Sequence, residues 1–244
     1  MMLLIVGLVA FFTIHLIPTN RELRNGLVER FGEGGYKAFF SIASLIGFIL
    51  IVYGYGKMQD YLGSKNPVLW IAPTWMSHLV LLLMIPAFIA LVAAFIPSNI
   101  GATLKHPMLV AVKIWARAHL LVNGDVASLV LFSSFLSYAV YDRISLKRRG
   151  DPGRSSEGAT FVNDAVVVGL GLTLYILMAF YGHPFLIGVP VVGERLDAVM
   201  AETGRLIGIA RRSKRLEPMQ VLTRGRITCE AGLEGDHKGA KFKL

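Results

Sequence analysis

Histidines are the side chains through which this sequence could do chemistry. Five of the six lie in or beside strongly apolar stretches: His15, His78, His106, His119 and His183. Neutral imidazole is a common ligand of metals and of haem iron. A histidine inside a membrane also hydrogen-bonds to neighbouring helices, so each has a plain structural interpretation beside the ligand one. His15 and His119 lie deepest in their apolar stretches, whereas His78 and His183 lie near stretch ends, so His15 and His119 are the first candidates.

The stretch "KHPMLVAVKIWARAHLLVNGD", residues 105–125, combines histidine with fixed positive charge. On a helix, His106, Lys113 and Arg117 fall within roughly 40° of one another. His119 lies roughly 140° away from His106. A charge near a helix end can reach the interface, but a charge in mid-span costs ~2.5–3.5 kcal/mol on insertion scales. We therefore expect both polar faces to meet protein, water or a bound group.

Lys113 and Arg117 indicate an anionic partner inside the membrane. An internal carboxylate such as Asp125 or Asp164 is the simplest structural partner for these cations. The propionates of a haem are the more specific functional alternative, because Arg and Lys pair well with carboxylates where the dielectric is low. The spacing of the two cations does not choose between these partners.

His106 and His119 cannot both bind one metal ion, because the residues between them place them about 20 Å apart along the helix axis. Any metal or haem at this helix needs a histidine from another apolar stretch. His106 also precedes Pro107, an arrangement typical of a helix start, so it can simply cap the helix.

The apolar residues predict the elements that position these side chains. The chain has 244 residues that are 54% hydrophobic, more than a soluble domain of this length usually has, and the excess is gathered in blocks. The single cysteine excludes an internal disulfide and a cysteine-based metal cluster. We predict an all-α, polytopic transmembrane helix bundle in a lipid bilayer, with about six spans: residues 2–17, 38–56, 75–96, 105–125, 126–141 and 165–181.

The positive charges indicate an orientation rather than a nucleic-acid partner. The net charge is +9, but Lys and Arg lie mainly between the apolar blocks, with clusters in residues 19–37 and 142–163. Cytoplasmic loops are enriched in Lys and Arg, so these two loops are predicted inside and the N-terminus outside. Within the first loop, Thr19 and Glu22 have capping-box spacing, which predicts a short connector helix in the interface or in solvent.

Three stretches resemble the NnrU family of bacterial membrane proteins: "FFTIHLIPTNRELRNGLVERFGEGGYKAFFSIASLIG", "LKHPMLVAVKIWARAHLLVNGDVASLVLFSSFL" and "YGHPFLIGVPVV". The resemblance covers about residues 1–192. It implies a multi-pass protein of the inner membrane that is associated with nitric oxide metabolism in denitrification.

The same pattern is similar to that of zeta-carotene isomerase, a membrane enzyme that uses haem b to isomerise a polyene double bond. This resemblance implies haem b here, with His15 in "FFTIHL" and His119 in "WARAHLL" as axial ligands. Leu16 stands where the relatives usually have a small residue. In the predicted topology His15 lies toward the inner end of its span and His119 toward the outer end. By depth alone, His106 is the better partner for His15.

Residues 193–244 differ from the rest of the chain, because they are polar and contain Gly and charge throughout. Their "GLEGDH" turn resembles the beginning of a MOSC domain, the β-rich module of molybdenum-cofactor sulfurases. Cys229 does not stand at the reactive position of that family. We expect a truncated remnant, partly β or disordered, that is too short to bury a core and has no cofactor chemistry.

The leading hypothesis for function is a membrane protein that binds haem b between its spans. An enzymatic role, as a haem-dependent isomerase acting on a lipophilic polyene, depends on the resemblance alone. The second hypothesis is a cofactor-free accessory or transport protein, whose partner would be a respiratory or denitrification enzyme. Sulfur transfer of the MOSC type needs a complete domain and ranks last.

Overall fold

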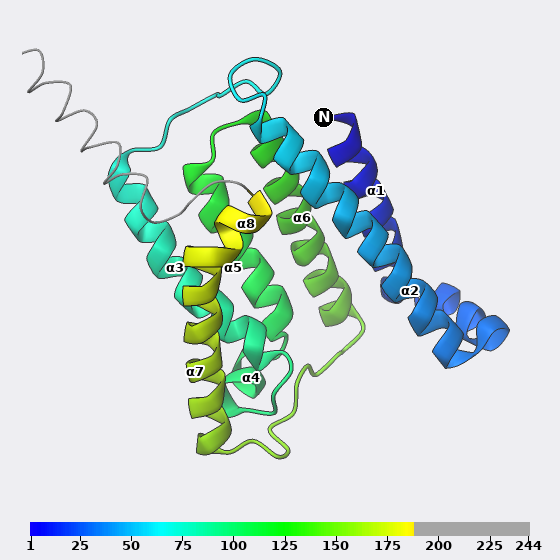
Figure 1. Ribbon diagram of the computed structural model, residues 1–244. Helices are drawn as coiled ribbons and strands as arrows, with labels where there is room; N and C mark the ends of the chain where they lie inside the picture. The colour runs from blue at the N-terminus through cyan, green and yellow to red at the C-terminus, as the bar shows by residue number, and fades with distance from the viewer. Residues whose placement is uncertain (188–244) are drawn as a thin grey trace, which may run out of the picture. The chain divides into compact units, whose positions relative to one another are not determined.

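The structure, a computed structural model, describes residues 1–187 (Figure 1). The chain divides into two units, Met1–Val192 and Gly193–Leu244. The tail that resembles a MOSC domain, together with Cys229, therefore lies outside the described residues. The elements are α1 (Met2–Leu16), η1 (Ile17–Thr19), α2 (Arg21–Gln59), α3 (Thr74–Ala93), α4 (Asn99–Leu104), α5 (Pro107–Val122), α6 (Val126–Arg148), α7 (Phe161–Leu177), η2 (Met178–Gly182) and α8 (His183–Ile187).

The predicted all-α bundle is confirmed for the described part of the chain. Residues 1–187 contain helices and two isolated β-bridges but no strand. Five segments within them are long and apolar enough to cross a membrane: Met2–Thr19, Arg21–Gln59, Thr74–Ala93, Val126–Arg148 and Phe161–Leu186. The chain is therefore a multi-pass membrane protein by the length and composition of its helices.

The predicted span at residues 105–125 is shorter than expected. α5 has 16 residues, below the usual length of about 17–25 for a membrane span. Lys105 has a positive φ of 61°, which ends α4, and Pro107 begins α5 because it needs no backbone donor there. α5 packs between α3 and α6, so this short helix belongs to the interior of the bundle.

The connector helix in the first basic loop is confirmed, but its cap is not the predicted one. Asn20 caps the helix, because its side chain accepts a hydrogen bond from the Leu23 N–H at 3.1 Å. Thr19 still belongs to the 3₁₀ turn that contains Pro18, and its hydroxyl donates to the Leu16 carbonyl instead. Gly32, at φ 72° and ψ 162°, then separates the connector from the membrane-spanning part of α2.

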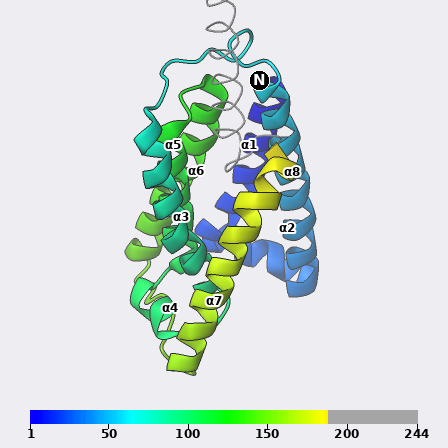
Figure 2. The ribbon, with the colours of Figure 1, turned by 60° about the vertical axis from the view of Figure 1, so that its left-hand side comes forward.

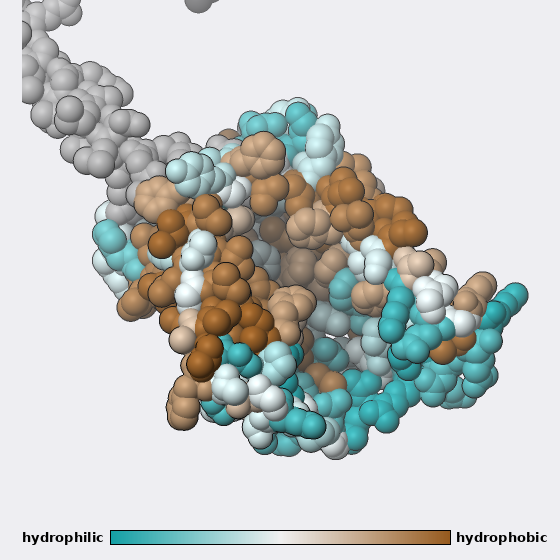
Figure 3. All heavy atoms as spheres, turned by 60° about the horizontal axis from the view of Figure 1, so that its bottom comes forward, coloured by the Kyte–Doolittle hydropathy of each residue, from teal (hydrophilic) through white to brown (hydrophobic). Residues whose placement is uncertain are grey.

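α1 and α2 pack as an antiparallel pair, and this pair packs on α6. Buried apolar residues of α1, α2, α5 and α6 form one cluster: Leu4, Leu8, Ile51, Tyr55, Met58, Ala116, Ala127, Leu131 and Phe132. Figure 2 shows α3, α5 and α6 on one side and α1 and α2 on the other. Apolar side chains over α7 and over the α1–α2 pair stand on either side of a hollow in Figure 3.

The long helices run alternately down and up in Figure 1, which gathers the two basic loops at one end. The connector helix, α4 and the loop after α6 lie at the lower end, and the loop between α2 and α3 lies at the upper end. The predicted sidedness requires both basic loops at the same end, as they are here, and that this end is inside stays a prediction.

Cysteine labelling is expected to show which end is inside. Ser64 and Ser156 are exposed in loops at opposite ends of the bundle. In a Cys229→Ser background, a membrane-impermeant thiol reagent should label Ser64→Cys in intact spheroplasts and label Ser156→Cys only after lysis. The reverse pattern would show that the basic end lies outside.

Candidate functional site

His119 is held as a metal ligand would be held. Its Nδ1 lies 2.9 Å from the carbonyl oxygen of Trp115, one helical turn earlier. A carbonyl oxygen only accepts hydrogen bonds, so Nδ1 carries the hydrogen and Nε2 keeps its lone pair. The ring stacks on Phe132, with centroids 4.7 Å apart at 28°, and touches the Trp115 ring at 5.4 Å. The local environment therefore fixes the tautomer and surrounds the ring with aromatic carbon.

The His15 ring on α1 is held in the same way, by a hydrogen bond to the backbone carbonyl one turn earlier. Its Nδ1 lies 2.8 Å from the carbonyl oxygen of Phe11, so here too Nε2 keeps its lone pair. The ring stacks on Phe11 with centroids 3.9 Å apart and also lies near the rings of Phe40 and Tyr138. The Tyr138 hydroxyl donates to the His15 backbone carbonyl at 3.1 Å, which ties the end of α1 to α6.

The structure does not bring His15 and His119 into contact. A chain of aromatic rings lies between them: Phe11 is 5.5 Å from Phe135, and Phe135 is 5.3 Å from Trp115. His15 is at the basic end of α1, whereas His119 lies in the last turn of α5, toward the opposite end. The two residues have matching local geometry at different depths.

His106 caps α5, as its position before Pro107 predicts. Its backbone begins the helix, and its Nε2 is buried with no hydrogen-bond partner among the described residues. Burial, followed by the positive charge of Arg143, lowers the pKa of His106. His106 and His15 both lie within electrostatic range of Asp142, so they share the basic end of the bundle.

Lys113 and Arg117 face away from the imidazole of His119. Lys113 is partly buried near Arg143 and Arg117, and Arg117 is exposed. Neither cation forms an ion pair within residues 1–187. The His119 side of α5 therefore meets protein, while Arg117 is not covered by the described chain.

The two carboxylates considered as partners of these cations are used elsewhere. Asp164 accepts hydrogen bonds from the Asn99 side chain at 2.8 Å and from the Ile100 N–H at 3.1 Å. Asp125 caps α6, and it also accepts from Asn66 at 2.8 Å and from Gln59 at 3.3 Å. Burial opposes ionisation of Asp125, but these hydrogen bonds and those from Ser128 hold its pKa below the ordinary value.

His183 comes closest to His119 of the other histidines. The ring centroids are 6.4 Å apart and the ring planes are 18° from parallel. His183 begins α8 directly after the π-helix Met178–Gly182. Sequence reasoning gave it little weight because it follows the last apolar segment. The π-helix is the structural signal, since such turns occur often at functional sites, and it was not visible in the sequence.

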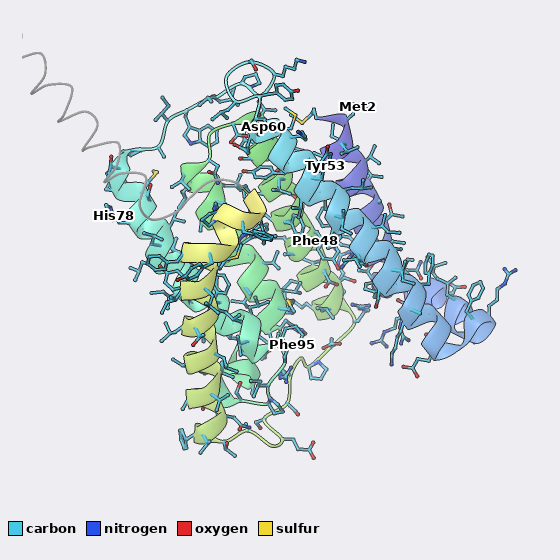
Figure 4. The ribbon with its side chains drawn as sticks, viewed as in Figure 1. Met2, Phe48, Tyr53, Asp60, His78 and Phe95 are labelled. Atoms are coloured by element: carbon cyan, nitrogen blue, oxygen red, sulfur yellow. The ribbon has the colours of Figure 1, made fainter. Side chains whose placement is uncertain are left out.

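His78 does not join the other histidines. It lies exposed near the start of α3 and points away from the bundle (Figure 4). Within residues 1–187, no group of three or more His, Cys, Asp or Glu side chains could hold a bare metal ion. The donor set near His119 instead consists of imidazoles among aromatic rings.

Comparison with known proteins identifies one family. No curated protein and no solved structure matches the chain. The family described as NnrU protein matches residues 3–191, which cover all of the helices described above except the first residue of α1. The chain therefore belongs to the NnrU family.

Proposed function

We propose that this NnrU-family protein binds haem b between its helices, with His119 as a ligand of the iron. The observation that supports this most is the hydrogen bond from Nδ1 of His119 to the Trp115 carbonyl, which leaves Nε2 as the donor atom. Ligating histidines characteristically donate their other ring hydrogen to a carbonyl or carboxylate. Phe132 and Trp115 pack on the His119 ring, hold its orientation and surround it with apolar carbon.

The residues present fit a haem better than a bare metal ion. A porphyrin supplies four nitrogens, so the protein needs to add only one or two imidazoles. His119 and His15 both have the required tautomer. The cations once considered for the propionates, Lys113 and Arg117, lie on the other side of α5 and are not part of this site.

The physiological role we propose is in nitric oxide metabolism linked to denitrification, in the inner membrane. The haem would supply electron transfer or binding of a small ligand, and the protein would orient it and exclude water. If the protein is an enzyme, the activity we propose is isomerisation of a lipophilic polyene. An open groove of about 500 Å³ between α2 and α8 could take an apolar chain, because Phe48, Tyr53 and Leu186 line it, with Lys57 and Asp60 at the same groove. Figure 4 shows where Phe48, Tyr53 and Asp60 lie on α2 and just after it.

Absorption spectroscopy of the detergent-purified, haem-supplemented protein tests haem binding. The wild type should show a Soret band, and His119→Ala should lose most of it, with haem affinity falling by at least ~10-fold. His78→Ala is the matched control, because His78 is exposed and away from the site, and its spectrum should be unchanged. A wild type with no Soret band, or a native spectrum in His119→Ala, would refute the proposal.

A cofactor-free accessory role is the second candidate, and exposed Arg117 favours it. A cation on the outer face of a short helix is costly in lipid and is stabilised by a polar partner. If the role is assembly, a respiratory or denitrification enzyme should co-purify with the wild type and be lost with Arg117→Leu. Lys57→Leu, at an exposed ion pair near the upper end, should leave co-purification intact.

A further inference from the structure

Three fixed positive charges toward the basic end of the bundle have no negative partner in the described part of the chain. They come from α5 and α6, and we call them the cation cluster: Lys113, Arg117 and Arg143. We propose that the cation cluster binds the phosphate of an anionic phospholipid. This site is separate from the haem site proposed above, so either proposal can fail while the other stands.

The fold brings the cation cluster together from two packed, antiparallel helices. α5 begins at the basic end and α6 ends there (Figure 1). At 1.5 Å per residue, Lys113 is about 9 Å from the start of α5 and Arg143 is about 8 Å from the end of α6, so the two lie at similar depth. Arg117 follows Lys113 by four residues, which places both on one face of α5. The charges of Arg117 and Arg143 both act on Lys113.

The nearby carboxylates are engaged elsewhere and do not neutralise the cation cluster. Asp142 precedes Arg143 in the chain, but its carboxylate lies 3.9 Å from the Arg149 guanidinium and is largely buried. The Asp151 carboxylate accepts a hydrogen bond from the Gly153 N–H at 2.9 Å. No member of the cluster forms a hydrogen bond or an ion pair with another described residue. Like charges are therefore held side by side, which costs free energy unless an anion binds among them.

Two other arginines at the same end do have structural partners. Arg149 donates hydrogen bonds to the backbone carbonyls of Pro18 and Thr19. Arg154 donates to the backbone carbonyl of Ala94. These two side chains tie loops to the helices, whereas the cation cluster makes no such contact among the described residues. Its members are therefore available to bind a ligand.

His106 adds a second observation beside the cation cluster. Its Nε2 atom is buried and has no hydrogen-bond partner within residues 1–187. The charge of Arg143 acts on the His106 ring, so the two side chains lie within electrostatic range of each other. Buried polar atoms nearly always have a partner, either in the protein or in a bound molecule or ion. This nitrogen indicates, independently of the three cations, that a polar group belongs at this end of α5.

The position of the cation cluster favours a lipid over a soluble anion. Long Lys and Arg side chains reach from within the membrane to the headgroup layer. Basic pockets between transmembrane helices on the cytoplasmic side bind anionic headgroups, and Arg pairs strongly with phosphate. Exposed apolar side chains flank Arg143 on α6, namely Val140 and Ile144. Acyl chains can lie against these side chains while the phosphate contacts the cations.

Native mass spectrometry of lipid retention tests the cation cluster. The full-length protein in a neutral detergent is mixed with phosphatidylglycerol or with phosphatidylcholine that has the same acyl chains. The wild type should retain phosphatidylglycerol at least ~5-fold more strongly than phosphatidylcholine. Lys113→Gln, Arg117→Gln and Arg143→Gln should each weaken this retention roughly 5-fold. Lys147→Gln is the matched control, because it removes an exposed charge of α6 outside the cluster and should change retention by less than about 2-fold.

Thermal unfolding distinguishes lipid binding from a purely structural role. Phosphatidylglycerol should raise the unfolding temperature of the wild type but not that of Arg117→Glu. Without lipid, Arg117→Glu should be at least as stable as the wild type, because the new carboxylate lies one turn from Lys113 and can pair with it. A variant that unfolds at a lower temperature without lipid would show that Arg117 supports the fold instead of binding a lipid.

Equal retention of the two lipids by the wild type, or an equal loss in Lys147→Gln, would overturn the proposal. Displacement of phosphatidylglycerol by inorganic phosphate at the same concentration would show a site for a soluble anion instead. If the cluster variants lost haem but kept the lipid, the cations would bind the haem propionates. His119→Ala should still retain phosphatidylglycerol. A protein that takes up no haem but retains this lipid would refute haem binding and support the lipid site.

Discussion

Replacing Asp125 by alanine is expected to lower the free energy of unfolding by about 3 kcal/mol or more, the largest effect that we expect from a single side chain outside the histidine site. The Asp125 carboxylate accepts hydrogen bonds from the Asn66 amide at 2.8 Å and from the Ser128 N–H at 2.9 Å. The Ser128 hydroxyl adds another at 2.5 Å. Asn66 and Ser128 are fully buried. Removing the acceptor strands several buried donors, each at a cost of about 1–3 kcal/mol.

Thermal unfolding in detergent, followed by circular dichroism, measures this loss. Asp125→Asn should lose less than Asp125→Ala, because its side-chain carbonyl can still accept from Ser128. Asp60→Ala is the matched control, since the Asp60 carboxylate is exposed in a surface ion pair with Lys57 and should contribute about 0–1 kcal/mol. Equal unfolding temperatures for Asp125→Ala and Asp60→Ala would show that the buried network does not stabilise the fold.

The importance of Asp125 could not be predicted from the sequence. Asn66 and Gln59 lie about sixty residues before it in the chain, and nothing local indicates that the loop after α2 folds onto the turn before α6. Gly124 shows how close that approach is, because a Cβ there would meet the Trp70 carbonyl oxygen. Long-range polar contacts of this kind are set by the tertiary fold.

The helices themselves were largely predictable, because each apolar block is long enough to need a span. α3, α6 and α7 begin within a few residues of the predicted segments. The predicted span at residues 105–125 is longer than α5, because the helix begins only at Pro107 and ends at Val122, before the turn in which Asp125 caps α6. The break at Gly32, which ends the connector helix, could not be located from the hydrophobic pattern.

The site was predicted in part. The types of residue and the local pattern pointed to His119 and His15, and their matching hydrogen bonds to the preceding turn follow from helix geometry. The sequence did not show that His183 lies near His119 in three dimensions, so His183 was given little weight. Lys113 and Arg117 were placed by helical periodicity on a different face from His119, and both faces were expected to meet protein, water or a bound group because charge in mid-span is costly.

Replacing Gly54 by alanine is expected to destabilise the protein by about 1–3 kcal/mol, because α1 and α2 touch through their backbones at this residue. A Cβ on Gly54 would lie 2.6 Å from the Leu4 nitrogen and 2.8 Å from the Leu4 Cα. Backbone atoms cannot move aside as the end of a side chain can, so the helices must separate. Leu4 is fully buried in the main apolar cluster, which would lose contacts as they do.

Gly56, two residues later on the same helix, supplies the control for Gly54. A Cβ at Gly56 meets nothing within 4 Å, so Gly56→Ala should gain up to about 1 kcal/mol from helix propensity alone. The two substitutions add the same methyl group to the same helix, yet their unfolding temperatures should shift in opposite directions. If both variants were stabilised, α1 and α2 would not be in backbone contact in the folded protein. A loss at Gly54 alone shows that the close packing of α1 on α2 supports the cluster that joins them to α5 and α6.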